Sequence, residues 1–101
     1  MLSFFKRLFQ QSNEGLEAAF QKGAVIIDVR TKTEYQQGHV EGSKNIPLNE
    51  IKLKLDTIRK WNKPVVTVCR SGSRSAMAKN LLKTAGIEVY NGGAWTSLNR
   101  K

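Results

Sequence analysis

The sequence holds one cysteine, Cys69, and one histidine among its 101 residues. A single cysteine excludes a disulfide framework within the chain, and no cluster of residues has the spacing of zinc ligands. The chain also lacks internal repeats, low-complexity tracts and linkers. Its composition, with 40% hydrophobic and 25% charged residues, is ordinary for a globular protein. A chain of this length is expected to form one domain around a small core.

Acidic residues are scarce, and the formal net charge is +9. From Trp61 onward, seven Lys and Arg residues accompany a single acid, Glu88. Such a field concentrates small anions near a site. Nucleic acid or anionic lipid would respond to the same charge, but the basic residues are not interleaved with aromatic ones as in RNA-binding modules. We therefore expect no nucleic-acid partner.

Residues 1–11 read as an N-terminal amphipathic extension that precedes a domain over residues 12–101. The apolar side chains of this extension fall on one helical face, and Lys6 and Arg7 fall on another. It is too short and too charged to span a bilayer, and it lacks the features of a secretory signal. Two interpretations stay open, a helix packed on the domain and contact of residues 1–10 with a membrane surface.

Segments typical of strands alternate with segments typical of helices. This order implies right-handed crossovers and a small, mostly parallel sheet with helices on both faces, which is an α/β fold. Ligands of such sheets bind beyond the carboxyl ends of the strands. Asn49 is expected to cap a helix, and Gly92-Gly93 is expected to turn the chain before a last helix near Trp95. The expected helices cover residues 13–23, 31–37, 49–59 and 74–85, and the expected strands cover 24–29, 44–47, 65–68 and 87–90.

The stretch around Cys69 predicts a nucleophile. Cys69 lies where a β-branched strand ends and a helix begins, and unsatisfied N–H groups at a helix start attract an anion. Arg70 and Arg74 add positive charge, and Gly72 permits the positive φ of a tight loop. These features favour the thiolate, which is the reactive form of cysteine. A lone cysteine at a strand end is often an inert core residue, but a core position is not followed by a polar loop with two arginines.

The loop at residues 69–75, Cys-Arg-Ser-Gly-Ser-Arg-Ser, resembles the active-site loop of single-domain rhodaneses, which are sulfurtransferases. Other segments resemble the first signature and the C-terminal motif of this family, in the same order. The resemblance implies the rhodanese-like fold over about residues 12 to 98. The matching segments are Asp28-Val29-Arg30, Glu34-Tyr35, Gly38-His39-Val40, Gly42-Ser43, Asn45-Ile46-Pro47 and Asn91-Gly92-Gly93-Ala94-Trp95.

The resemblance implies double displacement through a persulfide on Cys69. The thiolate attacks the outer sulfur of an anionic donor such as thiosulfate, and cyanide or a thiol then accepts that sulfur. No metal and no organic cofactor is needed, and the thiolate must stay reduced, which suits a cytoplasmic setting. Donor binding is assigned to the loop residues Arg70, Ser71, Gly72, Ser73, Arg74 and Ser75.

Other polar residues of the motifs are expected to be structural. Asp28 and Arg30 would fix neighbouring loops, and Glu34 would pair with Arg30 or with Arg74. His39 stands at a position that the resemblance assigns to structure, although a base for Cys69 is the alternative. Trp95 belongs to the core or walls the entrance to the pocket, and Trp61 is a packing residue.

Two further functions compete with the sulfurtransferase. A persulfide relay or binding module that acts with a protein partner would need the same Cys69. A cysteine-dependent phosphatase fits less well, because only four residues separate Cys69 from Arg74 and Val68 precedes the cysteine. That loop is one residue shorter than the tyrosine phosphatase signature.

Overall fold

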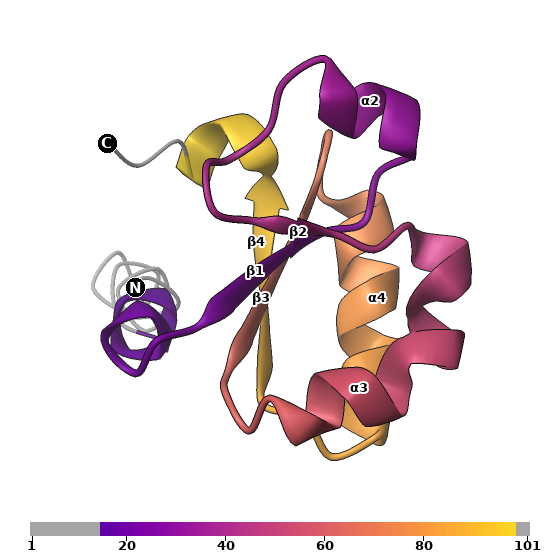
Figure 1. Ribbon diagram of the computed structural model, residues 1–101. Coiled ribbons are helices and arrows are strands. Elements are labelled where there is room, and N and C mark those ends of the chain that lie inside the picture. Colours follow the sequence, from indigo (N-terminus) through magenta and orange to yellow (C-terminus); the bar gives the residue numbers. More distant parts are fainter. Residues whose placement is uncertain (1–14, 99–101) are drawn as a thin grey trace, which may run out of the picture.

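The computed structural model describes residues 15–98 and contains a four-stranded, fully parallel sheet. The strands lie in the order β2-β1-β3-β4 (Figure 1), so the chain builds outward from β1 in both directions. Their bounds are β1 Val25–Asp28, β2 Lys44–Asn45, β3 Val65–Cys69 and β4 Val89–Ala94.

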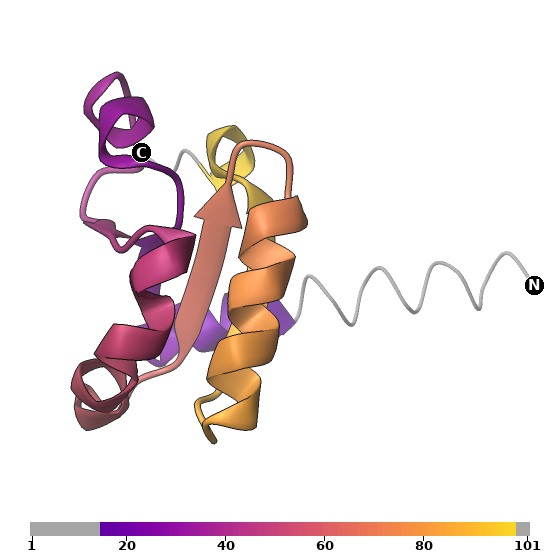
Figure 2. The same ribbon diagram turned by 90° about the vertical axis from the view of Figure 1, so that its right-hand side faces the viewer.

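Helices cover both faces of this sheet, as the sequence predicted. The α-helices are α2 (Lys32–Gln36), α3 (Leu55–Lys60) and α4 (Ser73–Thr84), and the 3₁₀ helices are η1 (Leu48–Lys54) and η2 (Trp95–Leu98). Residues 15–21 are also helical. Figures 1 and 2 show α3 and α4 over one face of the sheet and the helical residues 15–21 on the opposite face.

Strand β3 is buried at all five positions and joins the two halves of the core. On one face, Val65 and Cys69 pack in a cluster with Leu82 of α4. On the other face, Val66 and Val68 lie close to Gly92 of β4. Fully burying an aliphatic side chain contributes about 1.5–3 kcal/mol. Cys69 therefore stands at the end of the most deeply buried strand, where its position is fixed.

The predicted helical segment at residues 49–59 is confirmed, because η1 and α3 together cover residues 48–60, but the prediction that Asn49 caps it was wrong. The chain enters the 3₁₀ helix η1 directly after Pro47, and α3 follows without a side-chain cap. The tighter first part fully buries Ile51, and the later turn buries Ile58. Burial of two isoleucines outweighs the small preference of asparagine for a cap.

The prediction that Gly92-Gly93 turns the chain was also wrong. Strand β4 continues through both glycines, and its register shifts there, since Thr67 pairs with Asn91 and Val68 pairs with Gly93. Gly92 is the extra residue of this β-bulge, and a Cβ on it would lie 2.8 Å from side-chain atoms of Leu98 and Val66. The longer strand carries Trp95 to the carboxyl edge of the sheet.

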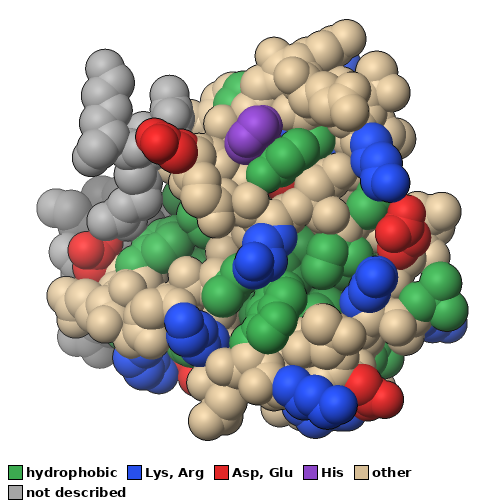
Figure 3. All heavy atoms as spheres, viewed as in Figure 1, with side chains coloured by type: hydrophobic (Ala, Val, Ile, Leu, Met, Phe, Trp, Pro, Cys, Tyr) green, Lys and Arg blue, Asp and Glu red, His purple; other side chains and the backbone are tan. Residues whose placement is uncertain are grey.

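The structure places the positive charge over the surface. Lys and Arg side chains are spread across the face drawn in Figure 3, with hydrophobic side chains between them. Between residues 15 and 98, no helix has the length and apolar character needed to cross a membrane. The predicted extension at residues 1–11 lies outside the described residues and stays a prediction.

Candidate active site

Two loops meet at the carboxyl edge of the sheet, one after β1 and one after β3. In the first loop, Asp28 is fully buried, and the Arg30 side chain donates to both carboxylate oxygens at 2.7–3.0 Å. The backbone N–H of Arg30 also donates to Asp28 at 3.0 Å. The Arg30 guanidinium reaches the carbonyl of Gly38 at 2.7 Å. A buried ion pair is tolerable only when its hydrogen bonds are satisfied in this way, so these two residues hold the loop in place.

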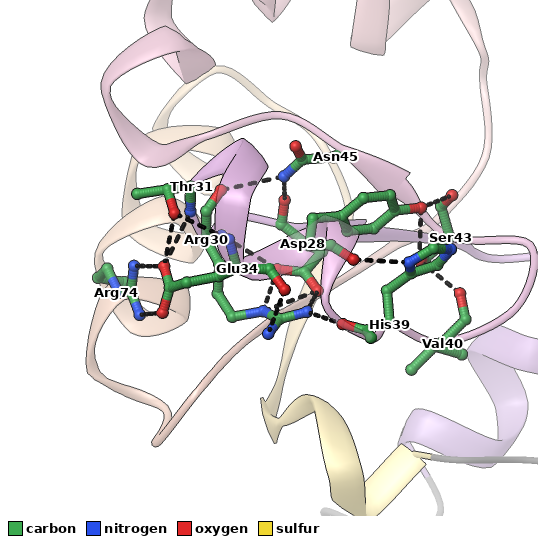
Figure 4. A network of polar contacts seen from close by, with 11 residues as sticks. Asp28, Arg30, Thr31, Glu34, His39, Val40, Ser43, Asn45 and Arg74 are labelled. Carbon is green, nitrogen blue, oxygen red and sulfur yellow. Dashed lines mark hydrogen bonds and ion pairs between the residues drawn. The ribbon is translucent and has the colours of Figure 1, made fainter.

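Glu34 ties α2 to the second loop. It forms a capping box with Thr31 at the start of α2, and it accepts two hydrogen bonds from the Arg74 guanidinium at 2.8 and 3.0 Å (Figure 4). The hydrogen bond from Arg74, followed by that from the Thr31 N–H, lowers the pKa of Glu34 to about 2. Of the two partners expected for its carboxylate, the structure selects Arg74. The backbone carbonyl of Glu34 also accepts a long contact, 3.4 Å, from Arg30.

Trp95 walls a cavity of about 320 Å³ at this edge. Its ring lies 4.6 Å from the guanidinium carbon of Arg30. A Cβ on Gly38 would come within 3.2 Å of the ring, so the loop after β1 fits closely against the tryptophan. Of the two placements considered for Trp95, the structure supports the pocket wall. The cavity is lined by Arg30, Glu34, Gln37, Gly38, Arg70 and Trp95.

His39 and Trp61 make local contacts of their own. The His39 ring stacks on Tyr35 at 3.8 Å between centroids, and its Nδ1–H donates to the Tyr35 carbonyl at 2.8 Å. Trp61 packs against the core cluster, with the Lys44 ammonium 5.6 Å from its ring. These contacts explain both residues without a role in chemistry.

The sulfur of Cys69 is surrounded by hydrogen-bond donors from its loop. Its Sγ accepts the backbone N–H of Gly72 at 2.9 Å and lies 3.4 Å from the Ser75 hydroxyl. Gly72 adopts φ +107°, a conformation that suits glycine alone, and this turns its N–H back toward the strand end. The loop therefore forms a small nest of N–H groups around one sulfur.

This nest changes the acidity of Cys69. Burial raises the pKa of the thiol and is the largest single influence. The hydrogen bonds of the Ser75 hydroxyl and of the N–H groups of Ser75, Gly72 and Ser71 act together in the other direction. Their combined effect wins, and the pKa of Cys69 lies below its ordinary value. Hydrogen bonds to the charged form thus favour the nucleophilic thiolate.

The two arginines of the loop have different surroundings. Arg70 is exposed, lines the cavity and has no ion-pair partner among residues 15–98. Arg74 is held by Glu34, and its pKa is raised chiefly by that hydrogen bond. Ser73 begins α4 beside them. Of the other loop residues, Ser71, Gly72 and Ser75 donate hydrogen bonds to the sulfur, and the charge of Arg74 acts on it. The role of Ser73 in donor binding stays a prediction.

Asn91 belongs to this site, although the sequence analysis did not single it out. Its Oδ1 accepts the Ser75 hydroxyl at 2.7 Å and the Gly93 N–H at 2.9 Å, and its Nδ2 donates to the Gly72 carbonyl at 3.3 Å. The signal in the sequence was its place in the Asn-Gly-Gly segment. The sequence analysis interpreted that segment as a turn, and a turn gives no reason to place Asn91 near Cys69.

Within the described part of the chain, no group of three or more His, Cys, Asp or Glu side chains could hold a metal ion.

The sequence is similar to the sequences of known proteins. The family model of the rhodanese-like domain matches residues 12–96. The chain is 42% identical over 69 residues to the thiosulfate sulfurtransferase PspE of Escherichia coli, covering 66% of each chain. It is 33% identical to a tRNA sulfurtransferase of Thermoplasma acidophilum over 74% of this chain, but over only 15% of that relative.

The fold agrees with solved structures as well. A structure described as a rhodanese with anions from E. coli superposes with a TM-score of 0.67 at 39% identity, covering 72% of this chain and 88% of the other. Taken together, the matched domain, the sequence relatives and the shared fold show that this chain belongs to the rhodanese-like domain family.

Proposed function

We propose that the protein is a sulfurtransferase that moves a sulfane sulfur from an anionic donor to a thiophilic acceptor through a persulfide on Cys69. One observation carries the proposal: the only cysteine of the chain receives the Gly72 N–H at 2.9 Å in a nest of backbone donors. The similarity to PspE, whose name specifies thiosulfate, supports thiosulfate as the donor.

In the first step, the Cys69 thiolate attacks the outer sulfur of thiosulfate. A bond forms between Sγ and that sulfur, the sulfur–sulfur bond of the donor breaks, and sulfite leaves with the electron pair. The total negative charge is the same before and after. Cys69 is fully buried beneath its loop, so a small donor reaches the sulfur more readily than a bulky one.

The loop then stabilises the charge that develops. The N–H groups that lower the pKa of Cys69 would hold the terminal sulfur of the persulfide, as donors aimed at developing negative charge do in other enzymes. Arg70 would contact the oxygens of the donor, and Arg74 would add its charge from beside Glu34. The loop hydroxyls of Ser71, Ser73 and Ser75 would supply further donors.

In the second step, cyanide or a cellular thiolate attacks the terminal sulfur. The sulfur–sulfur bond breaks, and Cys69 leaves as the thiolate that began the cycle. No histidine base is needed, because the loop itself favours the ionised sulfur. The cycle requires a reduced cysteine, which is typical of the cytoplasm.

A persulfide relay to a protein partner is the second candidate. The observation in its favour is the relative from T. acidophilum, in which the matched region occupies only 15% of a tRNA sulfurtransferase. In that arrangement, the acceptor would be a thiol of another protein, and the same Cys69 persulfide would form.

The experiment measures transfer of sulfur from thiosulfate to cyanide, followed as thiocyanate. We expect turnover by the wild type, none by Cys69→Ser, and wild-type turnover by Thr84→Ala, a control at the far end of α4. A persulfide without thiocyanate release would support the relay. A folded, reduced wild type that gives neither persulfide nor thiocyanate would contradict both candidates.

A further inference from the structure

We propose that Asn91 is a positioning residue for Cys69, which it reaches through Gly72 and Ser75. The inference rests on the proposed function, because the ionisation of Cys69 matters only if its sulfur reacts. Asn91 stands on β4, outside the loop that follows the cysteine. Its side chain contacts Ser75 and Gly72 of the loop, and it is not among the residues that line the cavity with Arg70.

The first route runs through the backbone of Gly72. Its N–H donates to Cys69 Sγ at 2.9 Å, while its carbonyl accepts Asn91 Nδ2 at 3.3 Å and the Ala76 N–H at 3.0 Å. The N–H and the carbonyl of Gly72 belong to adjacent peptide groups that meet at its Cα, and their relative orientation is set by its backbone dihedral angles. By holding the carbonyl, Asn91 restrains Gly72 at the φ of +107° with which its N–H reaches the sulfur.

The second route runs through the hydroxyl of Ser75, which has one hydrogen and three neighbours that can accept it. These are Asn91 Oδ1 at 2.7 Å, the Gly72 carbonyl at 3.0 Å and Cys69 Sγ at 3.4 Å. In the thiol form, the S–H donates to the Ser75 oxygen, and the hydroxyl donates onward to Asn91.

When the thiol proton leaves to solvent, the Ser75 hydroxyl turns and donates to the sulfur. Asn91 Oδ1 is not left unpaired by this turn, because the Gly93 N–H still donates to it at 2.9 Å. Leaving a buried acceptor unpaired would be costly. The Asn91 amide therefore allows the Ser75 hydroxyl to accept a hydrogen bond from the thiol and to donate one to the thiolate.

The charged groups around Cys69 make no contact with Asn91 in the ion pairs that hold them. These groups are Arg70 of the loop, Arg74 of α4, Glu34 of α2, and Asp28 and Arg30 at the end of β1. Arg74 pairs with Glu34, Arg30 pairs with Asp28, and Arg70 has no ion-pair partner among the described residues. Arg74 is near enough for its charge to act on Cys69.

The test is a titration of Cys69 followed by the ultraviolet absorbance of its thiolate. The chain has one cysteine, so the same protein with Cys69→Ser is the blank for each variant. Asn91→Leu frees the Gly72 carbonyl, which weakens the aimed N–H bond to the thiolate, and it removes the neutral hydrogen bond from Ser75 that favours the thiol form. A hydrogen bond to a charged group is worth more than a neutral one, so the midpoint should rise and the thiolate fraction below the midpoint should fall about fivefold. Asn91→Asp should raise the midpoint further, because it adds a negative charge beside Ser75.

Asn45→Leu is the matched control. Asn45 also bridges loop backbone, through hydrogen bonds at 3.0 Å to the carbonyls of Asp28 and Arg30. It has no bond to Cys69, Gly72 or Ser75, so Asn45→Leu should lower stability and leave the midpoint at the wild-type value. Ser75→Ala should raise the midpoint, and Asn91→Leu should add less in that background than alone.

An unchanged midpoint in Asn91→Asp and Asn91→Leu, in folded samples, would overturn the proposal and leave Asn91 a purely structural bridge. That outcome is separate from the failure of the proposed function, because the titration needs no sulfur donor. Thiocyanate turnover by the wild type with unchanged midpoints would reject the role of Asn91 alone.

Discussion

The loop after β1 and the loop after β3 lie at the same edge of the sheet and are both rich in polar groups, yet their hydrogen bonds are arranged differently. In the first loop, the Arg30 guanidinium donates to the Asp28 carboxylate and to the Gly38 carbonyl, so two opposite charges are paired. In the second loop, the N–H of Gly72 donates to the Cys69 sulfur, whose pKa lies below its ordinary value.

This difference shows where chemistry is possible. Side-chain charges that neutralise one another chiefly fix a shape. Backbone donors that converge on one atom are already oriented when charge develops on that atom, so no reorganisation is needed at that moment. Under the proposed function, the first loop is the support and the second loop is the reactive element.

The largest effect should come from breaking the support. Asp28→Asn leaves Arg30 buried without its counter-charge, and we expect a loss of about 3–5 kcal/mol in the free energy of unfolding. Urea unfolding measures it, with Asp56→Asn as control, because the side chain of Asp56 is 87% exposed in its ion pair with Arg59. Equal stability of Asp28→Asn and the wild type would refute the role of the first loop as support.

A smaller effect should separate the two arginines of the second loop. Arg70 has no partner among the described residues and lines the cavity. Arg70→Gln should therefore raise KM for thiosulfate about tenfold, the value of one hydrogen bond to a charged group, without changing the thermal midpoint. Steady-state kinetics measures this. Lys83→Gln, which removes a charge from the last turn of α4, should leave KM nearly unchanged, and an equal rise in both variants would point to net charge instead.

The smallest effect should come from the ion pair that joins the loops. The pKa of Glu34 is lowered to about 2 from 4.5 by Arg74 and Thr31. The ionised Glu34 carboxylate therefore stabilises the folded state fully above pH 4.5, and this contribution disappears as the pH falls to 2. Glu34→Gln should cost about 1 kcal/mol at neutral pH, and this difference from the wild type should shrink across that range.

Urea midpoints over this pH range test the prediction for Glu34. The control is Glu41→Gln, since Glu41 is exposed and has no ion-pair partner in the described part of the chain. A difference between Glu34→Gln and the wild type that stays constant down to pH 2 would contradict the assignment.

The sequence alone predicted the parallel sheet and the place of Cys69 at its carboxyl edge, because both follow from local patterns. Alternating strands and helices indicate the sheet, and a polar loop between β3 and α4 indicates the reactive end. The partner of Glu34 was left open, since Arg30 and Arg74 are both arginines and the pairing joins residues 40 positions apart.

The bulge of β4 could not be predicted for a related reason. Gly92-Gly93 fits a turn as well as a bulge, and only packing against Val66 and Leu98 decides between them. Asn91 was missed along with the bulge, because its contact with Ser75 depends on the strand continuing. Tertiary packing, not local preference, sets these features.

If the loop after β3 holds a transferable sulfur on Cys69, treatment with thiosulfate should change the intact mass of the protein. We predict one added sulfur atom on the wild type, its loss on addition of cyanide, and no addition to Cys69→Ser. Absence of the added sulfur from folded, reduced wild type, or its presence on Cys69→Ser, would contradict the account.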